Sequence, residues 1–275
     1  MRCCKGQHLE AVNYAYARLS RAVFESAFLH EANFAKATLD EANFKQASLS
    51  HANFNQASLV NADLSAAILD GASLVGANLS GAVLKGASLV GADLRDAKIF
   101  NAVLTGVDLT DANLQGADLT GTTLFNAILS GTNLMAANLS GADLEGARLQ
   151  QVNLRQANLF RMDMGHEGHL MAPQGNPSSM VDVDLAQANL EGAHLERVPL
   201  HRDNLQAASL RHAYFQGTDM VDSHLEKADL CDTSFDEDSH LNQALLAGAV
   251  YDGRTRFPQG FDPGSSQMVE TGQSG

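Results

Sequence analysis

Residues 69–79 read Leu69-Asp-Gly-Ala-Ser-Leu-Val-Gly-Ala-Asn-Leu79, so that a leucine returns at every fifth position. The same spacing continues in both directions. From Leu9 to Met164 every position whose number ends in 4 or 9 is apolar, which gives 32 consecutive centres. Two residues before the centres, from Ala17 to Ala157, all 29 positions hold alanine, valine or threonine, and 25 of them hold alanine. A repeat this regular determines the fold more than any other feature of the chain.

A period of five fits neither regular element of secondary structure. Five residues advance an α-helix by about 500°, so the leucines would spread around its whole circumference. In a continuous strand, side chains alternate with period two, and an odd step of five would send successive leucines to opposite faces. The chain must therefore turn once per repeat. The leucine and the alanine then point inward, the residue between them points outward, and the remaining two residues form a corner.

Glycine often occupies the second position after a centre, as at Gly71, Gly76, Gly81, Gly86 and Gly91. The third residue of a type II turn has a positive φ, which glycine adopts without steric cost. The repeat therefore predicts a type II turn at each corner, and the inward alanines predict an interior filled by side chains.

These residues resemble the pentapeptide-repeat family. The resemblance implies an all-β fold, a right-handed, four-sided β-helix in which four repeats make one coil of twenty residues. A period of twenty is visible in the outward positions, because the column that starts at Asn13 and Asn33 is polar throughout its eight residues. It also places Phe24 over Phe44 and Phe34 over Phe54 as two stacks on opposite sides.

The repeat loses its phase after Met164. We predict a loop insertion at 165–182, which holds the first prolines of the chain, Pro173 and Pro177. The repeat resumes at Leu185 with looser inward positions. Among these, Asp203 has no explanation beyond a distorted coil, and one extra residue within 236–240 shifts the frame. The 46 centres amount to about eleven coils.

We therefore expect one β-helix domain over 1–251, with regular coils at 9–164 and less regular coils at 183–251. The segment 251–263 is similar to a C-terminal segment of pentapeptide proteins of cyanobacterial type. It predicts a cap in which Phe257 and Phe261 cover the last coil. The final residues, 264–275, are predicted to be disordered.

Composition excludes several classes of protein. The 275 residues carry 18 basic and 32 acidic side chains, a formal charge of -14, which argues against a protein that binds nucleic acid through basic contacts to phosphate. Mean hydropathy is -0.13, and no apolar run reaches the roughly 18 residues of a membrane span. The first residues lack the apolar core of a secretory signal, so we expect a cytoplasmic location.

No constellation of residues indicates catalysis, a cofactor or a metal. The acidic residues follow the repeat at outward positions, where nothing indicates a pocket that would perturb their pKa. His166 and His169 lie three apart in a glycine-rich loop without the helix motif of zinc proteases, and we interpret them as surface histidines. We therefore predict a protein that is not an enzyme; converging histidine and aspartate side chains in a deep pocket would favour the enzyme alternative.

Three sets of residues are candidates for binding a partner protein. A loop on a rigid scaffold often carries recognition, although this one is equally explained as a tolerated insertion. Outward β-branched residues on two adjacent sides could form an apolar patch, or could simply suit strand positions. The densest acidic run could likewise be a solvated surface. The three sets are His166, Glu167, His169 and Met171 in the loop; Ile68, Val83, Val103 and Ile128 outward; and Asp219, Asp222, Glu226 and Asp229 in the acidic run.

The leading hypothesis is a non-catalytic protein-interaction scaffold or regulatory adaptor, without a membrane or nucleic-acid partner and with its oligomeric state open. The alternative is DNA mimicry directed at DNA gyrase, as in the quinolone-resistance members of the family. Residues 165–240 hold 14 acidic and 4 basic side chains, whereas residues 1–100 are balanced. This uneven distribution weakens mimicry along the whole rod and favours a partner contact beyond residue 164.

Overall fold

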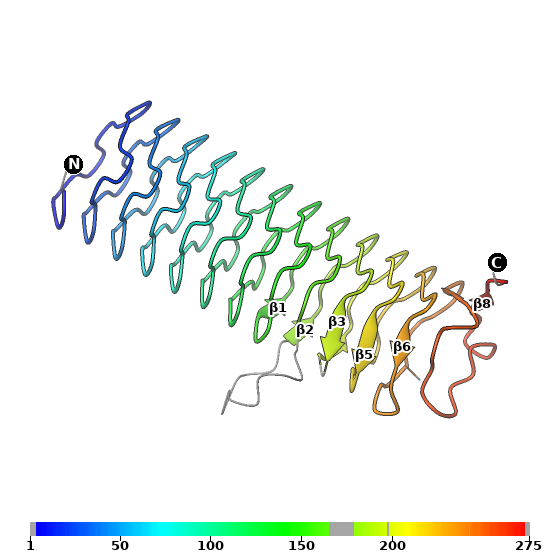
Figure 1. Cartoon of the computed structure of the whole chain (residues 1–275). Helices are drawn as coiled ribbons and strands as arrows, with labels where there is room; N and C mark the ends of the chain where they lie inside the picture. Colours follow the sequence, from blue (N-terminus) through cyan, green and yellow to red (C-terminus); the bar gives the residue numbers. More distant parts are fainter. Residues whose placement is uncertain (1–3, 165–178, 197, 242, 273–275) are drawn as a thin grey trace.

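The computed structural model describes residues 4–164, 179–196, 198–241 and 243–272. Figure 1 shows these residues as a rod of stacked coils, with the two termini at opposite ends. Every element of regular structure in the described residues is a strand or a single bridge, and none is a helix. The chain is therefore an all-β solenoid, as the repeat predicted.

The predicted coil of twenty residues is confirmed by the hydrogen-bonded bridges. In the first coils, four parallel bridges join residues twenty apart, so each coil has four sides. We number the sides by their first bridge. Side 1 starts at His8↔Phe28, side 2 at Asn13↔Asn33, side 3 at Arg18↔Thr38 and side 4 at Val23↔Asn43. Sides 1 and 3 face opposite directions, as do sides 2 and 4.

Short runs of two or three residues extend some of these bridges into strands. The strands are β1 (Arg148–Gln150), β2 (Ser179–Val181), β3 (His194–Glu196), β4 (Leu200–His201), β5 (Tyr214–Gln216), β6 (Ser234–Phe235), β7 (Val250–Tyr251) and β8 (Val269–Glu270). All pair in parallel, in the orders β1-β2-β4, β3-β5-β6 and β7-β8.

The core consists of the inward centres and alanines, which are almost completely shielded from solvent along the rod. The predicted phenylalanine stacks are present: the rings of Phe24 and Phe44 lie 4.9 Å apart and 10° from parallel, and those of Phe34 and Phe54 lie 4.9 Å apart and 7° from parallel. A fully buried leucine or phenylalanine contributes about 1.5–3 kcal/mol. The interior is therefore a packed core.

The corners have the geometry that a type II turn requires. In a representative corner, the N–H of Ala27 donates to the carbonyl of Phe24 at 3.0 Å, and the residue before Ala27, Ser26, has a φ of 55°. The same position has a positive φ whether it holds Gly131 (70°) or Gln46 (57°). Stacking between coils thus imposes the left-handed conformation even where the sequence does not supply glycine.

The insertion interrupts the sequence but not the stack of coils. Arg148 pairs with Ser179 and Asp163 pairs with His194, and both pairings span eleven residues more than a regular coil of twenty. The predicted loop was too long at its C-terminal end, because residues 179–181 form β2. That strand forms because Met180 is again an inward centre, fully buried between the coils on either side.

The C-terminal coils show the predicted shift of frame, since Asp219 bridges His240, which lies one position beyond the regular spacing. The ring of Phe257 stacks on Phe235 at 6.1 Å and on Phe261 at 5.0 Å. The prediction of disorder from residue 264 onward is wrong for the residues up to 272, because β8 pairs with β7 and continues the sheet. The last coil leaves a backbone edge unpaired, and β8 pairs with that edge although its segment lacks the five-residue repeat.

Candidate functional site

The outward apolar residues predicted from the sequence do not form one patch. Val83 and Val103 are bridge partners on side 4 and lie side by side, each half-buried. Ile68 and Ile128 both lie on side 1, but they are three coils apart, and Ser88 and Asp108 stand between them. Ile68 is 46% exposed as a single apolar side chain among polar neighbours.

The acidic candidates are spread around the rod. A coil of twenty residues visits all four sides, so a run of acidic residues in the sequence must wind around the molecule. Asp219 lies on side 1 with His201 (Oδ2 to Nε2, 3.1 Å), and Asp229 lies on the opposite side 3 with Arg211 (Oδ2 to Nη1, 3.1 Å). The other two, Asp222 and Glu226, occupy the two corners between those sides, where Glu226 contacts His224 at 3.3 Å.

The loop candidates His166, Glu167, His169 and Met171 lie outside the described residues. The structure does show where the chain leaves and rejoins the coils. It leaves after Met164, an inward centre of side 4, and rejoins at Ser179 on side 1. These two points flank the corner between the two sides that carry the outward apolar residues.

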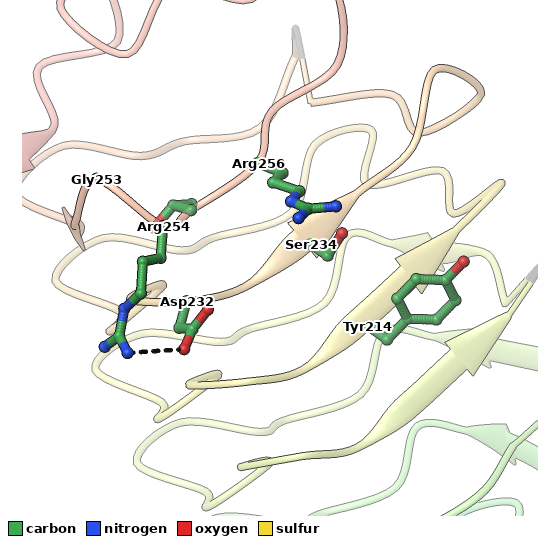
Figure 2. A pocket seen from close by; sticks show the side chains of 7 residues that line it. Tyr214, Asp232, Ser234, Gly253, Arg254 and Arg256 are labelled. Atoms are coloured by element: carbon green, nitrogen blue, oxygen red, sulfur yellow. Dashed lines mark ion pairs between the residues drawn. The ribbon is translucent and has the colours of Figure 1, made fainter.

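A shallow hollow of about 650 Å³ lies on side 4 near the C-terminal end of the rod (Figure 2). Its floor is one column of outward residues from three successive coils. Tyr214 in β5 pairs with Ser234 in β6, and Ser234 bridges Arg256. The corner residues that complete its lining are Asp232, Gly253, Arg254 and Thr255.

Ion pairs fix the corner beside the hollow. Asp232 Oδ2 lies 3.0 Å from His212 Nδ1 and 3.3 Å from Arg254 Nη1. Arg254 also lies 3.4 Å from Asp252. Burial alone would raise the pKa of Asp252, but hydrogen bonds from the N–H groups of Asp232 and Arg254 and from the hydroxyl of Thr255 outweigh it and lower that pKa to about 2. Asp252 is thus ionised at neutral pH and keeps Arg254 in place.

Arg256 differs from its neighbour Arg254. Among the described residues it forms no ion pair, and Figure 2 shows its guanidinium beside Ser234. Tyr214 presents a ring that is 40% exposed two coils away. A free guanidinium, two hydroxyls and an exposed aromatic face can bind an anionic group and an apolar group together. The described residues of the hollow thus offer groups for binding.

Sequence reasoning missed this hollow because the period slips. Ser234 follows Tyr214 by one regular coil, but the step from Ser234 to Arg256 is two positions longer. The residues could have been found only by allowing two single-residue insertions in the count, at 236–240 and again after Tyr251.

Within residues 4–164, 179–196, 198–241 and 243–272, no group of three histidine, cysteine or acidic side chains is arranged to hold a metal ion. Across the same ranges there is no helical segment with the length and apolarity needed to cross a bilayer.

Eight copies of the family described as "Pentapeptide repeats" match the chain, at residues 17–56, 57–96, 102–141, 137–161 and 204–236. The chain belongs to the pentapeptide-repeat family. The matched segments lie on both sides of the insertion, in keeping with a single stack of coils. No curated protein matches the chain.

Solved pentapeptide-repeat structures are among those similar to the chain. HetL, a pentapeptide-repeat protein involved in regulation of heterocyst differentiation in the cyanobacterium Nostoc sp. strain PCC 7120, is 31% identical over 80% of this chain and 89% of its own, with a TM-score of 0.47. Rfr23 from the cyanobacterium Cyanothece 51142 is 34% identical over 42% of this chain and 86% of its own, with a TM-score of 0.27. QnrB1, a plasmid-mediated fluoroquinolone resistance protein, is 15% identical over 72% of this chain and 89% of its own, with a TM-score of 0.41.

Proposed function

We propose that the chain is a non-catalytic scaffold that binds a partner protein through the hollow on side 4. The observation that carries this proposal is Arg256, a guanidinium that no described carboxylate neutralises, whereas the other described arginines after β2 all form ion pairs. Arginine and tyrosine are among the residue types enriched at the positions that contribute most to binding in protein interfaces, and Arg256 and Tyr214 line the same hollow.

The rod supports this role because it holds the binding groups rigidly. Each residue of the column that forms the hollow is bridged to the coil before it, and the corner beside it is fixed by ion pairs. A preorganised surface loses little conformational entropy on binding, which favours recognition. The partner surface that fits this hollow carries an acidic side chain opposite Arg256 and an apolar or aromatic side chain opposite Tyr214.

The alternative from the sequence, DNA mimicry at gyrase, receives no support from the placement of the acidic candidates. A mimic of duplex DNA needs unpaired carboxylates along one surface. Asp219 and Asp229 lie on opposite sides of the rod, and each has a basic partner. We therefore do not extend that alternative to this chain.

Affinity capture from the source organism tests the proposal. The bait is the full chain, and the variants are Arg256→Glu and Tyr214→Ala. The matched control is Arg18→Glu, which also reverses an outward arginine but lies on side 3 in the first coil, away from the hollow. The proposal requires a protein retained by the wild type and by the control but lost with both variants in the hollow. A partner that all four proteins retain equally would contradict the assignment of the surface.

A further inference from the structure

Several inward positions in the coils hold a hydroxyl in place of alanine, and three threonines among them make the same bond. Thr132, Thr218 and Thr233 are buried, and the hydroxyl of each donates to the carbonyl of a centre one coil back. These bonds join Thr132 to Leu109 (2.8 Å), Thr218 to Leu195 (2.7 Å) and Thr233 to Leu210 (2.7 Å). An inward polar side chain is thus tolerated when it can donate to the preceding coil.

Ser223 makes the same bond and one more. Its hydroxyl donates to the carbonyl of Leu200, again a centre one coil back, and accepts from the N–H of Asp203 at 3.2 Å. In an ordinary corner that N–H would close the turn on the centre three residues before it, as Ala213 does on Leu210 at 3.0 Å. The Ser223 hydroxyl is therefore inserted into the turn 200–203, where it satisfies the N–H and the carbonyl together.

Asp203 occupies the equivalent position one coil earlier and makes half of this arrangement. It is completely buried, and its Oδ1 accepts from the N–H of Val183 at 2.7 Å, which corresponds to the N–H that Ser223 accepts from. Its other oxygen, Oδ2, is buried without a hydrogen-bond partner among the described residues. The hydroxyls of Ser223 and the threonines each donate to the carbonyl of a centre one coil back. For Oδ2 of Asp203, the carbonyl at the corresponding position is that of Met180. A carboxylate has no proton to give to a carbonyl, whereas a carboxylic acid has one.

We propose that Asp203 is held as a neutral carboxylic acid near neutral pH and that its Oδ2–H donates to the carbonyl of Met180. The side chain then bridges the N–H of Val183 and the carbonyl of Met180, as Ser223 bridges those of Asp203 and Leu200. The proton is exchanged with water. Met180 is the middle residue of β2, the first described strand after residue 164. The hydrogen bond made by the Asp203 proton therefore links β2 to the coil that follows it.

The surroundings of Asp203 favour the neutral form. Burial is the main cause that raises the pKa of Asp203 to about 7, against the opposing effect of the Val183 N–H. Asp182 raises this pKa further and Arg202 lowers it, and these two form an ion pair with each other at 2.8 Å. The charged groups next in sequence to the contacting residues occupy outward or corner positions: Asp184 beside Val183, and Asp222 and His224 on either side of Ser223.

The consequence is an attachment of β2 that responds to pH. When Asp203 loses its proton, a charge is left buried and the Met180 carbonyl loses its donor. A buried polar group without a partner destabilises the closed state, so local opening becomes easier there. Above neutral pH we therefore expect local opening at β2 and Val183, while the coils of residues 4–164 stay closed.

Carbon-13 NMR of the Asp203 carboxyl in the full chain tests the proposal directly. The expected titration midpoint lies near 7, and a midpoint below about 5, typical of an exposed aspartate, would overturn it. In parallel, hydrogen exchange at the Val183 amide, corrected for its intrinsic rate, is expected to rise on the order of tenfold between pH 6 and pH 8.5.

Matched variants separate the proton from the fold. Asp203→Asn keeps an acceptor for Val183 and supplies an N–H for Met180, so its Val183 amide should be protected equally at both pH values. Asp184→Asn, an outward carboxyl next to Val183, should keep the wild-type dependence on pH. If the Asp203→Asn chain kept the tenfold change, the proposal would be wrong. If that variant failed to fold, the wild-type carboxyl titration alone would still decide.

Discussion

The side-chain amide of Asn189 donates to Oδ1 of Asn158 at 3.2 Å, across the insertion in the sequence. It continues a ladder in which Asn158 donates to Asn138 at 3.0 Å. The ladder passes the insertion without a break, so the coils before and after it form one stack.

The first prediction concerns this insertion. Removal of eleven residues from within 165–178 restores the spacing of twenty and should leave the rod folded. Shortening a loop changes its closure entropy by only about 1 kcal/mol, so the free energy of unfolding should change by no more than that. Urea unfolding followed by circular dichroism measures it. Loss of the folded signal would show that the insertion is part of the coil structure. The same variant, used as bait, would also show whether the insertion takes part in binding.

The second prediction concerns the phenylalanine stacks. Phe34→Ala removes a fully buried ring that stacks on Phe54, so it should lower the free energy of unfolding by about 3–5 kcal/mol. Phe28→Ala is the matched control, because that ring is 45% exposed on side 1. Its cost should stay below about 1 kcal/mol. Equal costs in urea unfolding would contradict the assignment of inward and outward positions.

The third prediction concerns the corners. Gln46 has a φ of 57°, a conformation that costs a residue with a side chain about 1–2 kcal/mol, so Gln46→Gly should stabilise the chain by about 1 kcal/mol. The reverse change, Gly86→Ala, should destabilise it by a similar amount, although the new Cβ would meet no atom within 4 Å. Thermal unfolding of both variants measures the effect. Opposite signs support the account, and a destabilised Gln46→Gly would count against it.

The fourth prediction is a pH dependence of stability caused by Asp203. In the folded chain its pKa is raised from 3.8 to about 7, so between these values the folded state binds a proton that the unfolded state has lost. Stability from this group is therefore complete below about pH 4 and falls as the pH rises to about 7, by up to about 4 kcal/mol. The difference between the wild type and Asp203→Asn in urea unfolding isolates this contribution. A constant difference from pH 4 to pH 8 would refute it.

Most of the fold could be predicted from the sequence, because one residue in five determines where the chain turns. The stacking of Phe24 on Phe44 follows from a period of twenty, which the outward columns also show. The strand at Val269 could not be predicted in this way. It pairs with Val250, one position short of the regular spacing, in a segment without leucine centres, and the backbone edge of the last coil alone supplies its partner.

The candidate site was less accessible to sequence reasoning. The sequence predicted a partner contact beyond residue 164, which stays a prediction, and the acidic run that motivated it winds around the rod. Arg256 enters the column only after two slips of the period, which the repeat does not reveal. Asp203 was visible as an anomaly, but its role depends on the carbonyls and N–H groups of the coils on either side.

Photocrosslinking from position 214 tests the central claim most directly. A photoreactive phenylalanine analogue is placed at Tyr214 in the hollow, or at Phe28 on side 1 as a control, since these two aromatic side chains are 40% and 45% exposed. The account predicts that irradiation in the source organism links a partner protein to position 214 and not to position 28, and that Arg256→Glu abolishes the link. A partner linked equally from both positions, or a link from position 214 that survives Arg256→Glu, would contradict it.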